Sequence, residues 1–125
     1  MVTSVITPAS KMIHVKTGTV ARTDTTAKTL FGLPKGAVVL FSLVEYQTAS
    51  DAGTSATVEV GLDADPDALG NGVSVKAAAD RPTLCSGASV GSATSSDGVV
   101  TGIYAETGTA STTGGPFNVS VFYTV

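Results

Sequence analysis

The stretch AVVLFSLVEYQTASDAGTSATVEVGL, residues 37–62, decides the fold. Its first 11 residues, 37–47, are mostly apolar and rich in Val, Phe and Tyr, which predicts a long central strand and not a helix. In residues 55–62 Ala56, Val58 and Val60 alternate with polar or small residues, the period of a half-buried strand. Because only a short loop, 48–54, separates these segments, we expect them to form an antiparallel hairpin.

The loop of this hairpin returns near the end of the chain. TASDAG at 48–53 reappears as TASTTG at 109–114, between the apolar segments VVTGIYAET (99–107) and FNVSVFYTV (117–125). The second copy therefore predicts a second hairpin, and neither copy holds a side chain suited to chemistry. Small side chains and glycine suit tight turns. The last segment predicts one apolar stripe along its strand, made of Phe117, Val119, Val121, Tyr123 and Val125.

The remaining segments predict further strands separated by polar turns. Residues 12–20 alternate as a half-buried strand does, with Ile13 and Val15 on one face and His14 and Lys16 on the other. Short strands are expected at 30–33, before a Pro-Lys-Gly turn, and at 73–79, after a turn region at 63–72. Residues 80–98 are expected to be mostly irregular with one short strand.

The sequence thus predicts an all-β protein of seven or eight strands. Thr, Ser, Val, Gly and Ala dominate, whereas the straight-chain helix formers are scarce, and no helix is convincing. We expect an antiparallel β-sandwich, specifically a jelly roll of about eight strands, formed by a single domain over residues 12–125. Residues 1–11, which lack periodicity and contain Pro8, are expected to form an extended N-terminal arm.

Composition excludes several classes of function. The chain has 125 residues, of which 14% are charged, with a single Cys85 and a single His14. These counts exclude an intramolecular disulfide and a Cys/His zinc cluster. A net charge of −3 and a pI near 4.8 argue against nucleic-acid binding. No apolar segment approaches the roughly 20 residues that cross a bilayer, and we expect neither membrane contact nor an export signal.

The charges are distributed unevenly along the chain. Residues 1–36 hold five basic residues against one acidic residue, +4, whereas residues 37–125 hold two against nine, −7. Two interpretations stay open: the basic segment marks an anchoring face, or its lysines are simply solvated. The basic residues are Lys11, Lys16, Arg22, Lys28 and Lys35.

One pattern formally matches a catalytic motif. Residues 87–91, GASVG, fit the G-x-S-x-G elbow that exposes a nucleophilic serine, here Ser89. That elbow requires a following helix and a later histidine, but Gly, Ser, Ala and Thr follow here, and His14 lies upstream. Cys85 has no histidine near it in sequence, and we expect it to pack as a small apolar residue. We therefore predict no catalytic residue and no enzymatic activity.

Two other patterns invite a ligand. Asp63, Asp65 and Asp67 resemble the opening of a calcium loop, but Ala68 and Ser74 stand where an EF-hand needs Gly and Glu. We favour a turn here and keep calcium binding as a testable alternative. The glycosylation sequon at 118–120 lies inside a predicted strand and is considered empty. No metal or cofactor site is predicted, and the three tyrosines, Tyr46, Tyr104 and Tyr123, are expected at the core or its rim.

Residues 29–69 resemble small structural proteins of tailed bacteriophages. In those proteins an LPxGAVV turn opens a long strand, a TASxAGTSATVxVG segment follows, and a DxDPDA loop closes the unit; this chain has all three, with a weaker echo at its C-terminus. The resemblance implies a capsid decoration, or cement, protein. Such proteins are compact β-sandwiches that form trimers on the outer surface of the head and clamp neighbouring major capsid subunits.

We therefore expect a homotrimeric decoration protein that binds the assembled head and stabilises it without catalysis, with the major capsid protein as partner. Its arm, residues 1–11, and the basic segment after it are expected to dock on the capsid or a sister subunit, with Lys11, Lys16, Arg22 and Lys28 as contact candidates. An alternative is a head-fibre or tail-associated module that binds host glycans. A hydrolase on a β-sandwich is a third class, disfavoured because acidic side chains are few.

Overall fold

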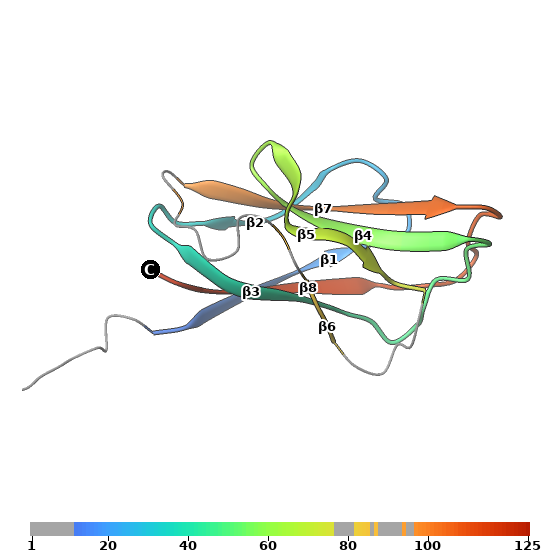
Figure 1. Ribbon diagram of the computed structural model, residues 1–125, viewed down its shortest axis with the longest axis horizontal. Coiled ribbons are helices and arrows are strands. Elements are labelled where there is room, and N and C mark those ends of the chain that lie inside the picture. The colour runs from blue at the N-terminus through green and yellow to red at the C-terminus, as the bar shows by residue number, and fades with distance from the viewer. Residues whose placement is uncertain (1–11, 77–81, 86, 88–93, 95–96) are drawn as a thin grey trace, which may run out of the picture.

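The computed structural model describes residues 12–76, 82–85, 87, 94 and 97–125, and over these residues the chain is all-β (Figure 1). Its strands form two four-stranded antiparallel sheets that pack face to face as a sandwich. The strands are β1 (His14–Val20), β2 (Lys28–Leu33), β3 (Val38–Glu45), β4 (Ser55–Leu62), β5 (Asp65–Ser74), β6 (Thr83–Leu84), β7 (Gly98–Thr107) and β8 (Phe117–Thr124).

The order of the strands identifies the topology. Sheet A has the order β1-β8-β3-β6, and sheet B has the order β2-β7-β4-β5. The first strand, β1, pairs with the last, β8, and the second strand, β2, pairs with the second-last, β7. Between these strands in the sequence, β3 pairs with β6 and β4 pairs with β5, so that the four pairs are nested. A nested set of antiparallel pairs divided alternately between two sheets is the jelly roll. The predicted eight-stranded antiparallel β-sandwich is confirmed.

Both predicted hairpins are wrong. The strands on either side of the first TAS loop lie in different sheets, β3 in sheet A and β4 in sheet B, and the same holds for β7 and β8. Each loop is a corner between the sheets. The physical reason is that β3 pairs with β8 and β4 pairs with β7, both far along the chain, and a local pattern carries no information about such pairing; the neighbour that β4 does pair with is β5.

The predicted turn at 63–72 is also mostly wrong. Only Asp63 and Ala64 turn, and β5 begins at Asp65 and pairs with β4 through two irregularities in register. Pro66 is tolerated in this strand because β5 is an outer strand of its sheet, where one side of the backbone has no ladder. Of the strand expected at 73–79, the first two residues end β5, and residues 77–79 lie outside the described part of the chain.

The core lies between the sheets and follows the predicted alternation. Phe117, Val119, Val121 and Tyr123 of β8 are buried, whereas Val125, expected in the same stripe, is 48% exposed because the strand has ended. The predicted inner face of β4, Ala56, Val58 and Val60, is likewise buried.

Ser42 and Cys85 place a hydroxyl group and a thiol group in this core. In β3, Ser42 is fully buried and its hydroxyl donates to the carbonyl oxygen of Leu69 in the opposite sheet, at 3.0 Å. Cys85 is buried as expected, and its burial raises the pKa of the thiol. Ser42 thus adds a hydrogen bond between the sheets at the centre of the sandwich.

Candidate interaction surfaces

The two TAS loops lie at the same end of the sandwich and are bonded to each other (Figure 1, right). The amide of Gly53 donates to the carbonyl oxygen of Thr109 at 2.7 Å. The carboxylate of Asp51 accepts hydrogen bonds from the amides of Thr112 and Thr113, at 2.7 and 2.9 Å, and from the Thr112 hydroxyl. These bonds, led by that of the Thr113 amide, hold the pKa of Asp51 far below its usual range.

Ser50 and Ser111, the serines at equivalent positions in the two TAS loops, both lie within hydrogen-bonding distance of the Tyr104 hydroxyl group. The hydroxyl of Tyr104 lies 2.6 Å from the Ser50 hydroxyl and 3.3 Å from the Ser111 hydroxyl, and it donates to Glu106 at 2.8 Å. Tyr104 is only 1% exposed, and its ring stacks on that of Phe117 with centroids 5.4 Å apart. The repeated loop sequence therefore closes the core symmetrically over one buried hydroxyl group.

The same cluster holds its carboxylate ionised. Glu106 accepts hydrogen bonds from the amide and hydroxyl of Ser111 and from Tyr104, and these bonds lower the pKa of its carboxyl group. Arg22 donates from Nη1 to the carbonyl oxygen of Ser111 at 3.0 Å. The hydrogen bonds of this serine–tyrosine–glutamate cluster tie the loop of residues 109–114 to β7 and so stabilise the corner.

The predicted basic contact residues are distributed over two places. Arg22 lies at the end with the TAS loops, whereas Lys16 and Lys28 lie along the open edge between β1 and β2. Lys16 Nζ donates to the carbonyl oxygen of Gly32 at 2.7 Å, and Lys28 Nζ donates to that of Thr19 at 2.9 Å. Each lysine thus joins the two sheets at their open side. Lys11 lies outside the described residues.

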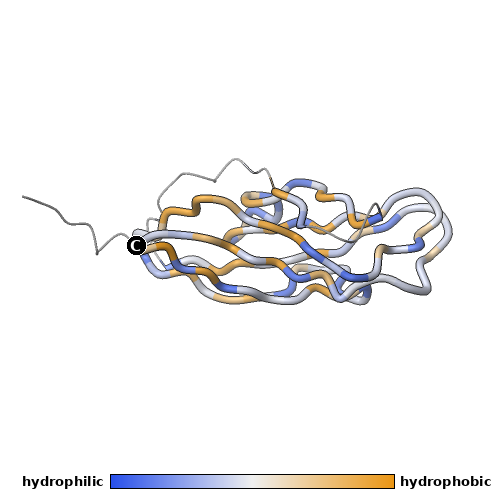
Figure 2. The backbone as a smooth tube through the Cα atoms, turned by 90° about the horizontal axis from the view of Figure 1, so that it is seen from below, coloured by the Kyte–Doolittle hydropathy of each residue, from blue (hydrophilic) through white to orange (hydrophobic). Residues whose placement is uncertain are grey.

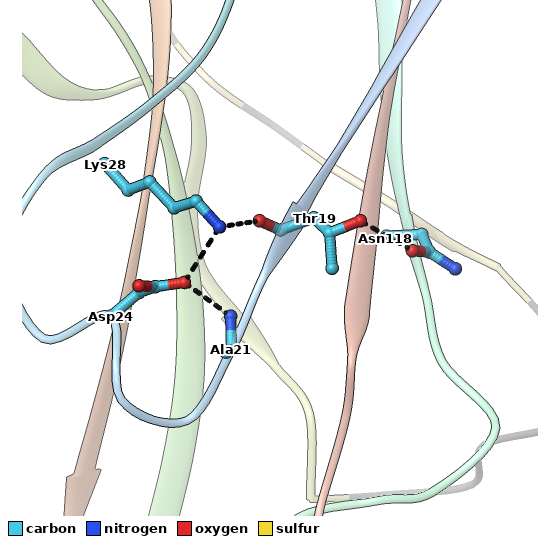
Figure 3. A network of polar contacts seen from close by, with 5 residues as sticks. All are labelled: Thr19, Ala21, Asp24, Lys28 and Asn118. Carbon is cyan, nitrogen blue, oxygen red and sulfur yellow. Dashed lines mark hydrogen bonds and ion pairs between the residues drawn. The ribbon is translucent and has the colours of Figure 1, made fainter.

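Figure 3 shows the surroundings of Lys28. Besides its bond to Thr19, the ammonium group lies 3.3 Å from Asp24 Oδ2, which also accepts from the amide of Ala21 at 2.7 Å. That backbone bond, with help from Lys28, lowers the pKa of Asp24. The hydroxyl of Thr19 continues the network to Asn118, the sequon asparagine, at 3.3 Å. This network fixes the link between β1 and β2 from both sides.

The three aspartates of the calcium alternative do not converge. Asp63 accepts a hydrogen bond from the amide of Val99 at 3.0 Å, and Asp65 accepts one from the amide of Asp67 at 3.4 Å. A side-chain hydrogen bond with Asp65 raises the pKa of Asp67. Among the residues that the structure describes, no three His, Cys, Asp or Glu side chains gather as metal ligands. Ser89 of the elbow pattern lies outside those residues.

In β1 the apolar face points to solvent. His14 stacks on the buried ring of Tyr123, with centroids 5.4 Å apart, so the polar face of the strand is turned toward the sandwich. Ile13 and Val15 are 62% and 53% exposed. The strand is confirmed, but the half-buried arrangement expected from its alternation is reversed.

Val15 belongs to an apolar patch on the outer face of sheet A. Across the sheet it pairs with Phe122, which pairs with Phe41, and these two rings stack with centroids 4.5 Å apart. One step along, Leu43 pairs with Leu84, which is 65% exposed. We call these residues the sheet A patch: Val15, Phe41, Leu43, Leu84 and Phe122. Contiguous apolar patches on soluble proteins commonly mark interaction sites.

The outer face of sheet A becomes polar toward the TAS loops. There Thr17 pairs with Ser120, at 3.1 Å between hydroxyl oxygens, and Asn118 stands between Thr19 and Glu45. Figure 2, which looks from the side of sheet A, shows the same change from apolar strands to pale and hydrophilic loops at the end away from the C-terminus. The patch is therefore limited to one part of one face.

The sheet A patch is not among the features predicted from the sequence, although the sequence holds a signal for it. A strand covered on one face alternates, but residues 37–44 are apolar at nearly every position. Val39 and Val44 supply the buried face, so Phe41 and Leu43 are apolar residues on the other face. An uninterrupted apolar run therefore indicates a second apolar surface in addition to a central strand.

Comparison with known proteins gives a likeness in structure. No protein-family model and no curated protein matches the sequence. A chain of the "Acidic stable capsid structure of Helicobacter pylori bacteriophage KHP30" is similar at a TM-score of 0.64 and 14% identity, over 94% of this chain and 90% of that one. A chain of the "Cyanophage Pam1 capsid asymmetric unit" is similar at 0.67 and 20% identity, over 100% and 93%. At these identities the comparisons show a shared fold. The described residues contain no helix able to span a membrane.

Proposed function

We propose that this chain is a structural protein of a bacteriophage capsid and, more narrowly, a decoration protein on the outer surface of the head. The observation that carries the proposal is the likeness in fold to chains of two phage capsid structures, over nearly the full length of both partners. A likeness of that extent involves the complete jelly roll and not a single sheet. The phage-like segment at 29–69 points in the same direction from sequence.

The proposed action is binding without chemistry. A protein that binds the assembled head and not its free subunits stabilises the head by mass action, in proportion to its affinity and concentration. A trimer multiplies a modest contact for each copy into firm attachment, because the copies bind from one rigid body. Within each copy, the bonded TAS corners and the lysine links between β1 and β2 support a rigid sandwich.

We assign attachment to residues 1–11 and to the basic residues Lys11, Lys16, Arg22 and Lys28, with the major capsid protein as partner. The internal bonds of Lys16 and Lys28 do not exhaust these groups, because an ammonium group has three donors. The Lys28 side chain remains 45% exposed beside Asp24. Contacts of this kind weaken as salt rises above about 0.1 M, where charges are screened over about 10 Å.

The test uses expanded heads that lack this protein. The chain without residues 1–11 should stay folded by circular dichroism but fail to sediment with the heads, and the alanine variant of the four basic residues should bind more weakly. Lys35→Ala, which changes a basic residue outside that set, is the control and should bind normally. Undiminished binding without residues 1–11 would refute this mode of attachment. The copy number in virions separates a decoration protein, present in many copies, from a fibre or tail module, present in few.

A further inference from the structure

We propose that the sheet A patch is the surface through which copies of this chain contact one another. This inference rests on the proposed function, in which the decoration protein acts as an oligomer, and it names the surface that builds the oligomer. The patch is made of Val15, Phe41, Leu43, Leu84 and Phe122, on neighbouring positions of four paired strands.

The composition of the patch is that of an interface core. Two stacked aromatic rings lie in its middle, and the most exposed apolar side chains, Val15 and Leu84, flank them on the outer strands β1 and β6. Thr17 and Ser120 border it on the side of the TAS loops. An apolar, aromatic centre with a polar rim is the usual anatomy of a protein interface.

The fold itself does not require these side chains to be apolar. The core between the sheets is filled from the opposite faces of the same strands, by Val39, Val44, Val119 and Val121. Phe122 lies in the same strand as Val121 yet points outward, to pair with Val15 and Phe41. Exposing apolar groups of this size costs solubility, so a partner surface accounts for them.

Charge favours a second copy as that partner. The chain carries −3 overall, so two copies repel each other on net, except where the basic residues 1–36 (+4) of one copy face the acidic residues 37–125 (−7) of the other. The patch itself contains no charged side chain, and among the described residues the nearest one on its face is Glu45, the next outward position after Leu43 along β3, opposite Asn118. The outer face of sheet B, by contrast, has Glu59 in its middle. Like molecules can therefore approach through the sheet A patch without opposing charges of the same sign.

The area of the outer face of sheet A determines how strongly two copies are expected to associate. With strands about 4.8 Å apart, the three long strands β1, β8 and β3, of seven or eight residues, cover on the order of 15 by 25 Å, roughly 400 Å², to which the two-residue β6 adds little. A standard interface buries about 800 Å² on each partner. Ile13, exposed just before β1 and on the same side as Val15 by alternation, extends the apolar surface at that end. We therefore expect reversible association of the free protein, strengthened when the copies are held together on a lattice.

Sedimentation velocity over a range of concentrations of the full chain tests this inference. The wild type should form a defined oligomer, and the double variant Val15→Ser/Leu84→Ser should weaken it about tenfold or more, because each side chain is apolar and exposed in the single copy. Val99→Ser is the matched control: Val99 is a 40% exposed valine of sheet B, and its loss should leave the oligomer unchanged. Circular dichroism verifies that all three are folded.

Three results would overturn the inference. The double variant associates like the wild type; or the wild type stays monomeric at every concentration; or association rises when residues 1–11 are removed, which would mean that this segment occupies the patch. Binding to heads is measured in parallel. If a monomeric wild type binds heads and the double variant does not, the patch contacts the capsid, and the proposed function stands while this inference falls. If nothing binds heads but the oligomer depends on the patch, the proposed function falls instead.

Discussion

The outer faces of the two sheets differ, although their inner faces are alike. Both inner faces are rows of buried valines and other apolar residues. Outside, sheet A presents two stacked phenylalanines flanked by exposed Val15 and Leu84. Sheet B presents Glu59 and Ile103 among small and polar residues, and its exposed Val99 has only Gly32 opposite it; the small and polar residues are Ser55, Thr57, Ala105 and Thr107. The sandwich needs only the inner faces to fold. The difference outside therefore reports on contacts that this molecule makes with others.

The largest change in the free energy of unfolding is expected from a substitution on the inner face of β8, compared with one on the outer face of the same strand. Phe117 of β8 is fully buried against Tyr46 and Tyr104, and Phe117→Ala should lower the free energy of unfolding by about 3–5 kcal/mol. Phe122→Ala, on the outer face of the same strand, should cost about 1 kcal/mol, mainly through its stacking on Phe41. Urea unfolding followed by circular dichroism measures both. Equal losses would mean that Phe122 belongs to the core, and the comparison would fail.

A smaller effect is expected at the corner that joins the sheets. Tyr104→Phe keeps the ring but removes the hydroxyl group that Ser50, Ser111 and Glu106 share. Because Ser50 is only 4% exposed, its hydroxyl group loses a hydrogen-bond partner and cannot bond to water instead. The free energy of unfolding should therefore fall by about 1–3 kcal/mol. The oligomer should persist, since the corner is distant from the sheet A patch. A fully stable Tyr104→Phe variant would contradict the closure of the corner over this group.

Acid should loosen the same corner. The pKa of Asp51 is lower in the folded chain than in the unfolded chain, so its contribution is fully present above the unfolded value of about 4. It is lost progressively as the pH falls below that value and through the lower folded pKa. Asp51→Asn should reduce this acid dependence and weaken the links to Thr112 and Thr113. Thermal unfolding of both proteins between about pH 7 and pH 2 checks this, and parallel curves would exclude the role of Asp51.

The smallest effect is expected on the outer face of sheet B. Glu59→Gln alters the charge there, and it should change the free energy of unfolding by less than about 0.5 kcal/mol and leave sedimentation unchanged. This variant sharpens the contrast between the faces. If it altered association, sheet B would be the contact surface, and the assignment to sheet A would be reversed.

The sequence was sufficient for features that depend on local patterns. The alternation of apolar residues predicts the inner faces of β4 and β8 correctly, except for Val125, which is exposed. The Pro-Lys-Gly turn follows β2 as expected, with Gly36 at φ 86°. Connections between strands were not predictable in this way. The TAS loops have the short, small-residue composition of hairpin loops, but whether the next strand joins the same sheet depends on partners far along the chain, from 38 positions away (Leu62 and Val100) to 86 (Val38 and Thr124).

The candidate surfaces were only partly foreseen, for a physical reason. Charge counts drew attention to Lys16, Arg22 and Lys28, but such counts cannot show that each of these side chains also bonds to a carbonyl oxygen of its own chain. The sheet A patch was hidden because hydropathy does not distinguish an apolar residue in the core from one on an outer face. The sequence could not predict that the polar face of β1 is turned toward the sandwich, because no local feature determines which face of an edge strand lies inward.

Sedimentation of the full-length chain with purified phage particles tests the central claim most directly. The chain is mixed either with expanded heads that lack it or with unassembled major capsid protein at the same concentration of subunits. We predict that it sediments with the heads to saturation, at a fixed ratio to the capsid subunits, and that it does not bind the unassembled subunits. A chain that remains in the supernatant, or that binds free subunits as tightly as heads, would contradict a decoration protein specific for the assembled lattice.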